Sequence, residues 1–182
     1  MKTLWAALLL IAIGLPGMPA LAFPDRGTIF LVDREGEETP VGSIVFSGSG
    51  ETRGFAVSLD TPLFNDHFLS MRPFRCIEGQ SEWFCHLPYP YDLKMTVSES
   101  DLKDLEYSLL FIRKAPSEFG IDAWNGLYYR LALRPDGSIA GELLEGDLNT
   151  LASPPDTDRP IDLDEFIKAE TGKRLYPGLI IR

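Results

Sequence analysis

The chain has 182 residues, with 17 basic and 27 acidic side chains and a formal net charge of −10 at pH 7. This acidity makes nucleic acid and anionic lipid surfaces poor partners, because both attract clustered lysine and arginine. Hydrophobic residues make up 45% of the sequence, which is typical of a globular protein rather than a disordered one.

The N-terminus has the pattern of a secretory signal peptide. An apolar block runs from Leu4 to Leu15, and Ala20-Leu21-Ala22 has the small residues of a signal-peptidase site. The block is shorter than the roughly 20 residues that span a bilayer, and no later apolar run is long enough to do so. We expect residues 1–22 to be removed and residues 23–182, with a formal charge of −11, to form one β-rich domain. Its expected location is the bacterial periplasm or, alternatively, the extracellular space.

The first half of this domain predicts a series of short strands. β-branched and aromatic residues alternate with polar ones, and runs rich in glycine, serine or charge separate them. Pro73 interrupts one run and indicates an edge strand or a bulge. The expected strands cover residues 28–32, 41–46, 53–59, 67–77, 83–86 and 93–98, and the first two form a hairpin.

The stretch that follows is ambiguous between helix and strand. Ser98 and Asp101 have the spacing of a helix cap, and the leucines from Leu102 onward repeat at helical spacing. The aromatic and aliphatic residues from Leu105 to Phe111 also alternate at strand spacing. We expect a single helical turn near residues 99–104 and then a strand to Arg113.

The second half predicts a strong hairpin and one helix. Apolar alternation at 126–133 and 138–144 flanks the turn Arg134-Pro135-Asp136-Gly137. Asp162 has the position of a helix cap, and Glu165 follows at the spacing of a capping box. We therefore expect a helix that begins at Asp162, and a last strand near residues 179–181.

These elements predict an all-β, mainly antiparallel fold of about nine strands with one C-terminal helix, built as a small β-barrel or β-sandwich. Their order, with several strands, then a helix, then a closing strand, is similar to that of the lipocalins. The Gly-x-Trp motif of the first lipocalin strand is missing between Phe23 and Val32. The resemblance concerns element order alone and implies no function.

Both cysteines lie in one short segment. Folding the segment as a hairpin around Gly79, Gln80 and Ser81 sets Cys76 opposite Cys85. In an exported protein, an even pair at this spacing predicts a disulfide rather than a metal or redox site. Two prolines after His86 then end the strand and stiffen the chain.

No established catalytic or metal motif is present. Ser49 lacks the strand-to-helix context of a nucleophile elbow, and Cys85 is expected to be oxidised. The aspartates between Asp156 and Asp164 do not fit an EF-hand, because Ile161 and Ile167 occupy the positions of its glycine and glutamate. We expect no cofactor and no metal site.

The aromatic residues are the best candidates for ligand contact. Their rings combine apolar faces with polar tips, which suits sugars, lipids and protein surfaces. Strand alternation sends Tyr128 and Tyr129 to opposite faces, so one fills a core while the other lines a cavity or meets solvent. The candidate ligand-binding residues are Trp83, His86, Tyr89, Tyr91, Trp124 and Tyr128.

Three functional hypotheses follow. The first is an exported, non-enzymatic β-domain that binds a lipid-like, glycan or protein ligand of the cell envelope with an aromatic cavity or rim. The second is an acidic inhibitor or immunity-type protein that captures a basic enzyme. The third is a hydrolase with paired carboxylates, for which 27 acidic side chains offer many pairs but single out none.

Overall fold

The structure is a computed structural model that describes residues 23–59, 62–70, 73–157 and 160–182, so the expected signal peptide lies outside the described residues. The strands are β1 (Arg26–Val32), β2 (Glu38–Ser47), β3 (Thr52–Ser58), β4 (Phe64–Phe68), β5 (Pro73–Glu78), β6 (Trp83–His86), β7 (Thr96–Ser98), β8 (Phe111–Lys114), β9 (Gly126–Leu133), β10 (Ile139–Gly146), β11 (Ile167–Lys168) and β12 (Gly178–Ile181). The helices are α1 (Lys103–Tyr107) and the short 3₁₀-helices η1 (Ala123–Asn125), η2 (Asn149–Ala152), η3 (Leu163–Glu165) and η4 (Thr171–Lys173).

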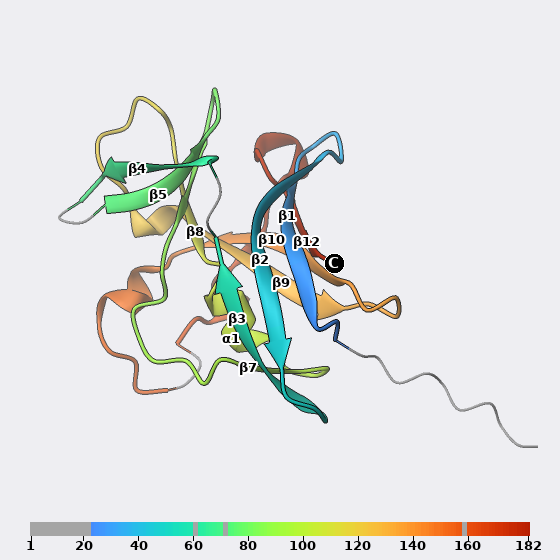
Figure 1. Cartoon of the computed structure of the whole chain (residues 1–182). Coiled ribbons are helices and arrows are strands. Elements are labelled where there is room, and N and C mark those ends of the chain that lie inside the picture. The colour runs from blue at the N-terminus through green and yellow to red at the C-terminus, as the bar shows by residue number, and fades with distance from the viewer. Residues whose placement is uncertain (1–22, 60–61, 71–72, 158–159) are drawn as a thin grey trace, which may run out of the picture.

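All twelve strands of the described chain belong to one antiparallel sheet (Figure 1). Its order is β4-β5-β6-β8-β9-β10-β12-β1-β2-β3-β7, with β11 paired to β10. The prediction of a mainly antiparallel fold is confirmed, whereas a closed barrel, a sandwich of two separate sheets and a count of about nine strands are wrong. The sheet stays open between β4 and β7, which lie at its two ends.

The sheet has a hydrophobic core on each face. The larger core contains apolar side chains of β1, β2, β3, β9 and β12, including Ile29, Ile44 and Tyr129. The smaller core covers the other face of β5, β6, β8 and β10, and contains both cysteines together with Tyr128. Tyr128 and Tyr129 therefore enter different cores, as strand alternation predicts. Both are fully buried, so the expectation that one of them lines a cavity or meets solvent is wrong.

The hairpins that turn chemistry indicated are present. β9 and β10 pair from Gly126↔Gly146 to Leu133↔Ile139, and Gly137 in their turn has φ +83°, which a side chain rarely tolerates. The expected 67–77 run is divided: β4 and β5 form an antiparallel pair with Phe68 opposite Pro73. Pro73 thus begins a strand, where its missing N–H is tolerated.

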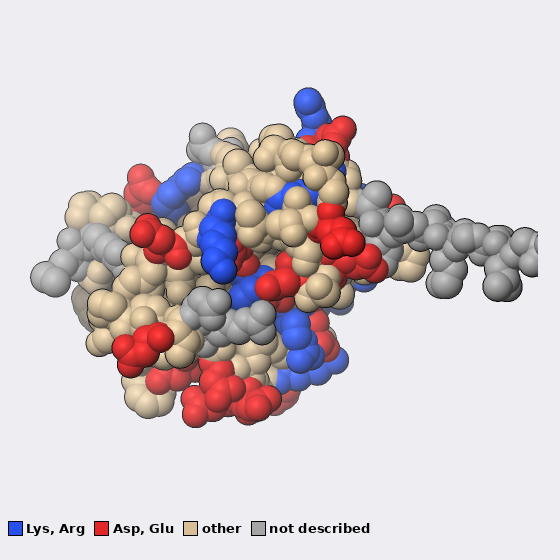
Figure 2. Space-filling view, turned by 90° about the horizontal axis from the view of Figure 1, so that it is seen from below, with Lys and Arg blue, Asp and Glu red and all other residues tan. Residues whose placement is uncertain are grey.

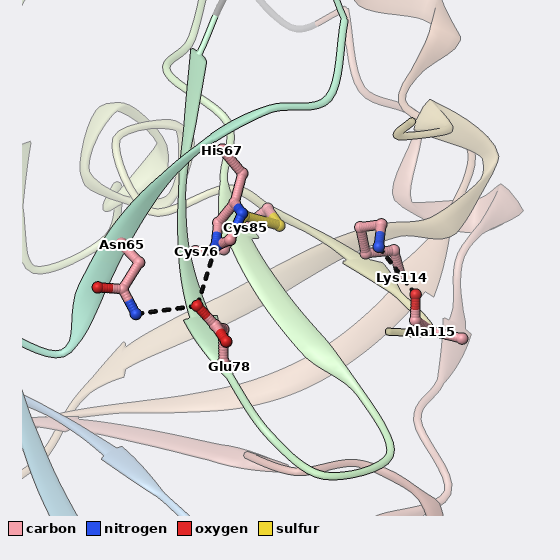
Figure 3. Close-up of a disulfide and its surroundings, with 7 residues drawn as sticks. All are labelled: Asn65, His67, Cys76, Glu78, Cys85, Lys114 and Ala115. Atoms are coloured by element: carbon pink, nitrogen blue, oxygen red, sulfur yellow. Dashed lines mark hydrogen bonds and ion pairs between the residues drawn. A yellow bond between two sulfur atoms is a disulfide. The ribbon is translucent and has the colours of Figure 1, made fainter. Parts of the chain in front are cut away.

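The predicted disulfide is present, and the residues around it pair in the predicted register. Cys76 faces Cys85, and Ile77 faces Phe84 in the β5–β6 pair. The Cα atoms of the two cysteines are 3.9 Å apart, and both side chains are fully buried. Figure 3 shows His67 of β4 beside the bridge. The bridge lies in the smaller core and ties β5 to β6.

The prediction of a C-terminal helix is wrong beyond the first turn. Asp162 caps as expected, because its side chain accepts from the N–H of Asp164, but the turn ends after Glu165. The chain then pairs with β10, and the Phe166 ring packs so closely on Gly146 that a Cβ there would lie 2.6 Å from it. Sheet pairing and this ring contact outweigh local helix propensity.

Residues 98–113, whose sequence is compatible with helix and with strand, contain one short helix and one strand. Both begin later in the chain than expected. Helix α1 begins at Lys103 rather than near residue 99, and its N-cap Leu102 makes no side-chain capping bond. Ser98 instead exchanges two backbone hydrogen bonds with Asp101. The strand begins only at Phe111 and ends at Lys114.

Removing the disulfide is expected to destabilise the fold without unfolding it. The double variant Cys76→Ala/Cys85→Ala should lower the free energy of unfolding by about 2.7 kcal/mol, because the loop closure no longer restricts the unfolded chain. In a thermal melt this corresponds to a fall of roughly 5–10 °C for a domain of this size. A reductant should lower the melting temperature of the parent chain and leave that of the variant unchanged. Equal melting temperatures for parent and variant under oxidising conditions would contradict the prediction.

Candidate functional site

The structure does not bring the six candidate residues to one place. Trp83 and His86 both belong to β6, but an odd number of steps separates them, so their side chains lie on opposite faces of the sheet. Trp124 is 69% exposed in η1, whereas Tyr128 is completely buried in β9. Tyr89 and Tyr91, in the segment after β6, are the pair that the fold places together. Ligand binding by any of the six stays a prediction.

Trp83 is partly buried and packs against the smaller core, which contains the disulfide. The centroid of the His67 ring lies 4.5 Å from that of the Trp83 ring, and the Lys114 ammonium lies 4.3 Å from the Trp83 centroid. His67 and Asn65 also bond to the Glu78 carboxylate at 3.0 and 2.9 Å, and these hydrogen bonds hold the pKa of Glu78 below its usual value. Trp83 therefore has well-defined neighbours that account for its position.

His86 has a structural environment. Its Nε2 lies 3.2 Å from the carbonyl oxygen of Ser108, and its ring packs edge-on against Phe111. Burial lowers the pKa of His86 below its usual value, and the positive charge of Arg75 adds to this, although the bond to Ser108 acts in the opposite direction. The fold therefore favours the neutral imidazole.

Tyr128 forms part of a buried polar network around Glu106 of α1. The Tyr128 hydroxyl donates to Oε2 of Glu106, and the N–H of Leu131 donates to Oε1 at 2.7 Å. The Lys103 ammonium lies 3.6 Å from Oε2. Both carboxylate oxygens are thus satisfied. Burial and the charge of Glu106 raise the pKa of Tyr128, so its hydroxyl stays protonated as the donor.

A pocket of about 290 Å³, here called the tyrosine pocket, lies between the segment after β6 and the start of α1. It is bordered by β7 and reaches Thr52 at the start of β3 and Thr157 in the loop after η2. Two rings and five charged side chains line it: Tyr89, Tyr91, Asp92, Lys94, Asp101, Lys103 and Asp104.

The two rings of the tyrosine pocket are part of an aromatic stack. Tyr89 and Tyr91 meet edge to face with centroids 5.7 Å apart, and Tyr89 stacks on the buried Tyr107 at 4.9 Å. The Tyr91 hydroxyl donates to the carbonyl oxygen of Leu151 at 2.8 Å. Partial burial raises the pKa of Tyr89, and Tyr91 and the negative charge of Asp104 add to the rise. The rings are therefore held from several sides.

The charged residues of the pocket were not among the sequence candidates. Asp104 accepts from the N–H of Thr96 at 3.2 Å, and Asp101 accepts from the N–H of Lys103 at 3.0 Å. Asp92 is exposed at the pocket wall. From the sequence, only Asp101 was given a role, as part of a helix cap, and no sequence motif singled out Asp92 or Asp104.

A second, more apolar hollow of about 470 Å³ lies on the other side of the same segment. Leu87, Pro90 and Ile112 line it, and Tyr91 borders both this hollow and the tyrosine pocket. Residues of the segment from Leu87 to Leu93 thus line both a polar pocket and a more apolar one. The tyrosine pocket contains both members of the candidate pair, whereas the apolar hollow contains only Tyr91, so the tyrosine pocket is the candidate site.

No three histidine, cysteine, aspartate or glutamate side chains gather into a metal-binding group in the described residues. Within the same residues, no helix has the length and hydrophobicity that crossing a membrane requires.

Fold and site together define a small, open antiparallel β-sheet domain with a tyrosine-lined polar pocket at one end of the sheet. Comparison of this chain with known protein families, with curated proteins and with solved structures finds no match.

The Glu106 network is expected to be a major contributor to stability. Glu106→Ala should lower the free energy of unfolding by about 3 kcal/mol, because it leaves the Leu131 N–H and the Tyr128 hydroxyl buried without their partner. Tyr128→Phe removes one hydrogen bond and should cost about 1–2 kcal/mol. Urea denaturation measures both. Glu99→Ala, an exposed neighbour, is the control and should change little; a cost for Glu106→Ala no larger than that of the control would contradict the structural role.

The lowered pKa of His86 predicts that the stability of the fold depends on pH. A histidine whose folded pKa is below its unfolded value binds a proton more tightly in the unfolded chain, so stability falls as the pH drops below about 6.5. Glu78 acts in a different window, near and below pH 4.5. His86→Gln should therefore flatten the decline in melting temperature between neutral pH and about pH 5.5, whereas His67→Gln should leave the His86 contribution in place. An identical decline in the parent and in His86→Gln would show that His86 is not responsible.

Proposed function

We propose that this chain is an exported, non-enzymatic β-domain that binds a small polar ligand of the cell envelope in the tyrosine pocket. The observation that carries the proposal is the coincidence of Tyr89 and Tyr91 with hydroxyl and charged side chains around one cavity. Aromatic faces combined with a few convergent polar groups are the usual composition of a ligand site.

The size and lining of the pocket favour a compact ligand. Its volume of about 290 Å³ is at the lower end of the range for small-molecule sites. Three aspartates, two lysines and several hydroxyl groups line it, and a long acyl chain would leave these groups without hydrogen-bond partners. Among the three ligand classes considered, a sugar-like or head-group-sized molecule therefore fits better than a lipid chain.

Export is supported by two observations. The N-terminal residues have the signal-peptide pattern, and the protein contains a buried disulfide, a bond that forms and persists in oxidising compartments. A periplasmic or extracellular location gives the pocket access to the soluble components of the envelope.

An acidic inhibitor that captures a basic enzyme is the second candidate. Asp156, Asp162, Asp164 and Glu165 are all exposed in the chain that follows η2. Figure 2 shows acidic side chains in several groups on one face, with basic side chains between them. This arrangement favours attraction of a basic surface at low salt.

A carboxylate-dependent hydrolase is the third candidate, since three aspartates line the tyrosine pocket. Asp101 and Asp104 each use a side-chain oxygen to hold a backbone N–H, which accounts for their positions without catalysis. Glu106 is likewise engaged at both oxygens.

The test is protein-observed NMR on residues 23–182 with soluble envelope components: amino sugars, N-acetylated sugars, choline and ethanolamine. Binding should shift backbone amides between residues 89 and 104 and leave β10 unaffected. Tyr89→Leu should weaken binding roughly tenfold, because it removes an aromatic face of the pocket. Trp124→Leu is the matched control, an exposed aromatic outside the pocket, and should bind as the parent does.

Three outcomes would overturn the proposal. The first is no shift with any compound, and the second is loss of binding in Trp124→Leu but not in Tyr89→Leu. The third is turnover of a sugar or ester during the titration, which would favour the hydrolase. Salt-sensitive capture of a basic enzyme, together with an unresponsive pocket, would favour the inhibitor.

A further inference from the structure

We infer that the ligand of the tyrosine pocket is a small organic cation that presents an ammonium group to the two tyrosine rings and the surrounding aspartates. This inference rests on the proposed function, because it specifies the chemistry of the molecule that the pocket binds. It predicts that neutral and anionic ligands of the same size bind more weakly.

The charges that line the pocket are unequal. Asp92, Asp101 and Asp104 provide three negative charges, while Lys94 and Lys103 provide two positive ones. The ammonium of Lys103 also lies 3.6 Å from Glu106, a carboxylate outside the pocket lining, and 3.4 Å from the Tyr128 hydroxyl. Its charge is thus largely balanced by Glu106. Asp101 also interacts within the protein, so the remaining lining has two carboxylates, Asp92 and Asp104, against the one ammonium of Lys94.

The position of the aromatic rings fits the same ligand. A cation placed over a tyrosine face is attracted by the negative charge of the ring, and the attraction strengthens when water is excluded. Tyr89 is half-buried, and Tyr89 and Asp104 both line this one pocket. A ring and a carboxylate therefore lie within reach of one ammonium group.

The net charge of the whole molecule also favours a cationic ligand. The formal charge of residues 23–182 is −11, so the protein attracts cations and repels anions at long range. A neutral sugar would gain the ring contacts but not this attraction. An anion would be repelled both by the pocket lining and by the whole chain.

The sharpest test compares two sugars that differ in charge. Glucosamine, at a pH where its amine is protonated, and N-acetylglucosamine have the same ring but only the first is a cation. Calorimetric titration of residues 23–182 should show glucosamine binding at least roughly tenfold more tightly, with an affinity that falls as salt is added. Choline, a cation without a sugar ring, should compete with it.

The carboxylates provide the matched variants. Asp92→Asn/Asp104→Asn removes two charges, and the asparagine at position 104 still offers an oxygen to the Thr96 N–H, so the local fold is kept. Glu35→Gln/Glu37→Gln removes two charges from exposed residues of the β1–β2 turn, far from β7 and α1 (Figure 1). The first variant should reduce glucosamine affinity roughly tenfold and the control much less. Should the first variant fold poorly, Asp92→Asn alone, at an exposed position, gives the same comparison.

The cation can come from a free amine or from a lipid head group. Free choline and ethanolamine test the first source, and vesicles of phosphatidylcholine or phosphatidylethanolamine test the second. Competition between free choline and the vesicles would show that one pocket binds both.

The outcomes separate the inference from the proposed function. If N-acetylglucosamine binds as tightly as glucosamine and both variants bind alike, the pocket binds a ligand but charge does not select it, and the inference is wrong. If no compound binds, the inference and the proposed function both fail. A tenfold preference for the cations that disappears in Asp92→Asn/Asp104→Asn alone supports both.

Discussion

The N–H of Leu131 points away from β10 at a place where β8 has already ended, and the carboxylate of Glu106 accepts its hydrogen bond. β8 pairs with β9 only at Phe111↔Leu127 and Ile112↔Gly126, so the rest of that edge of β9 needs other partners. A buried N–H without a partner costs about 1–3 kcal/mol. Helix α1 supplies the missing acceptor through one side chain, and this requirement fixes the helix against the sheet.

The tyrosine pocket depends on that contact. Lys103 and Asp104, on the first turn of α1, line the pocket, while Glu106 on the same helix holds Leu131 and Tyr128. The helix has only five residues and would not be stable alone. Its position, and that of two charged groups in the pocket, therefore follows from burial of the Glu106 carboxylate. The stability of this network and the geometry of the candidate site are physically coupled.

Local turn chemistry made several elements predictable, and long-range pairing made others unpredictable. Asp136 and Gly137 define a turn that few other residues can form, so the β9–β10 hairpin was correct in its bounds at Gly126 and Leu133. The facing of Cys76 and Cys85 also follows from a short turn alone. The helix expected at Asp162 failed because Phe166 packs on Gly146, a contact between residues 20 positions apart that no local pattern encodes. The closed barrel failed for a similar reason, since no local signal reveals which strands remain at the ends of a sheet.

The candidate site was partly predictable by the same reasoning. Tyr89 and Tyr91 stood out because prolines flank them and prevent a regular strand. Asp101 did not, because a cap and a pocket wall have the same sequence signal, and no motif singled out Asp104. Only the tertiary fold brings both beside the tyrosines. Trp124 was chosen by residue type and Tyr128 also by strand alternation, but alternation does not reveal whether both faces of a strand are covered. In the structure Trp124 is exposed to solvent and Tyr128 lies in the core.

Prolines and hydrogen bonds hold the segment that carries the two tyrosines, and this lowers the entropic cost of binding a ligand in the pocket. Pro88 and Pro90 restrict its backbone, and the Tyr91 hydroxyl is tied to Leu151 in η2. Just beyond its end, Met95 has φ +54°, a conformation that costs about 1 kcal/mol or more for a residue with a side chain. The hydrogen bond from the N–H of Phe55 to the Met95 carbonyl helps to hold this conformation. The surrounding contacts therefore impose the path of this segment. A pocket wall that is ordered before binding loses little conformational entropy when a ligand arrives, so even a small ligand with few contacts can bind there.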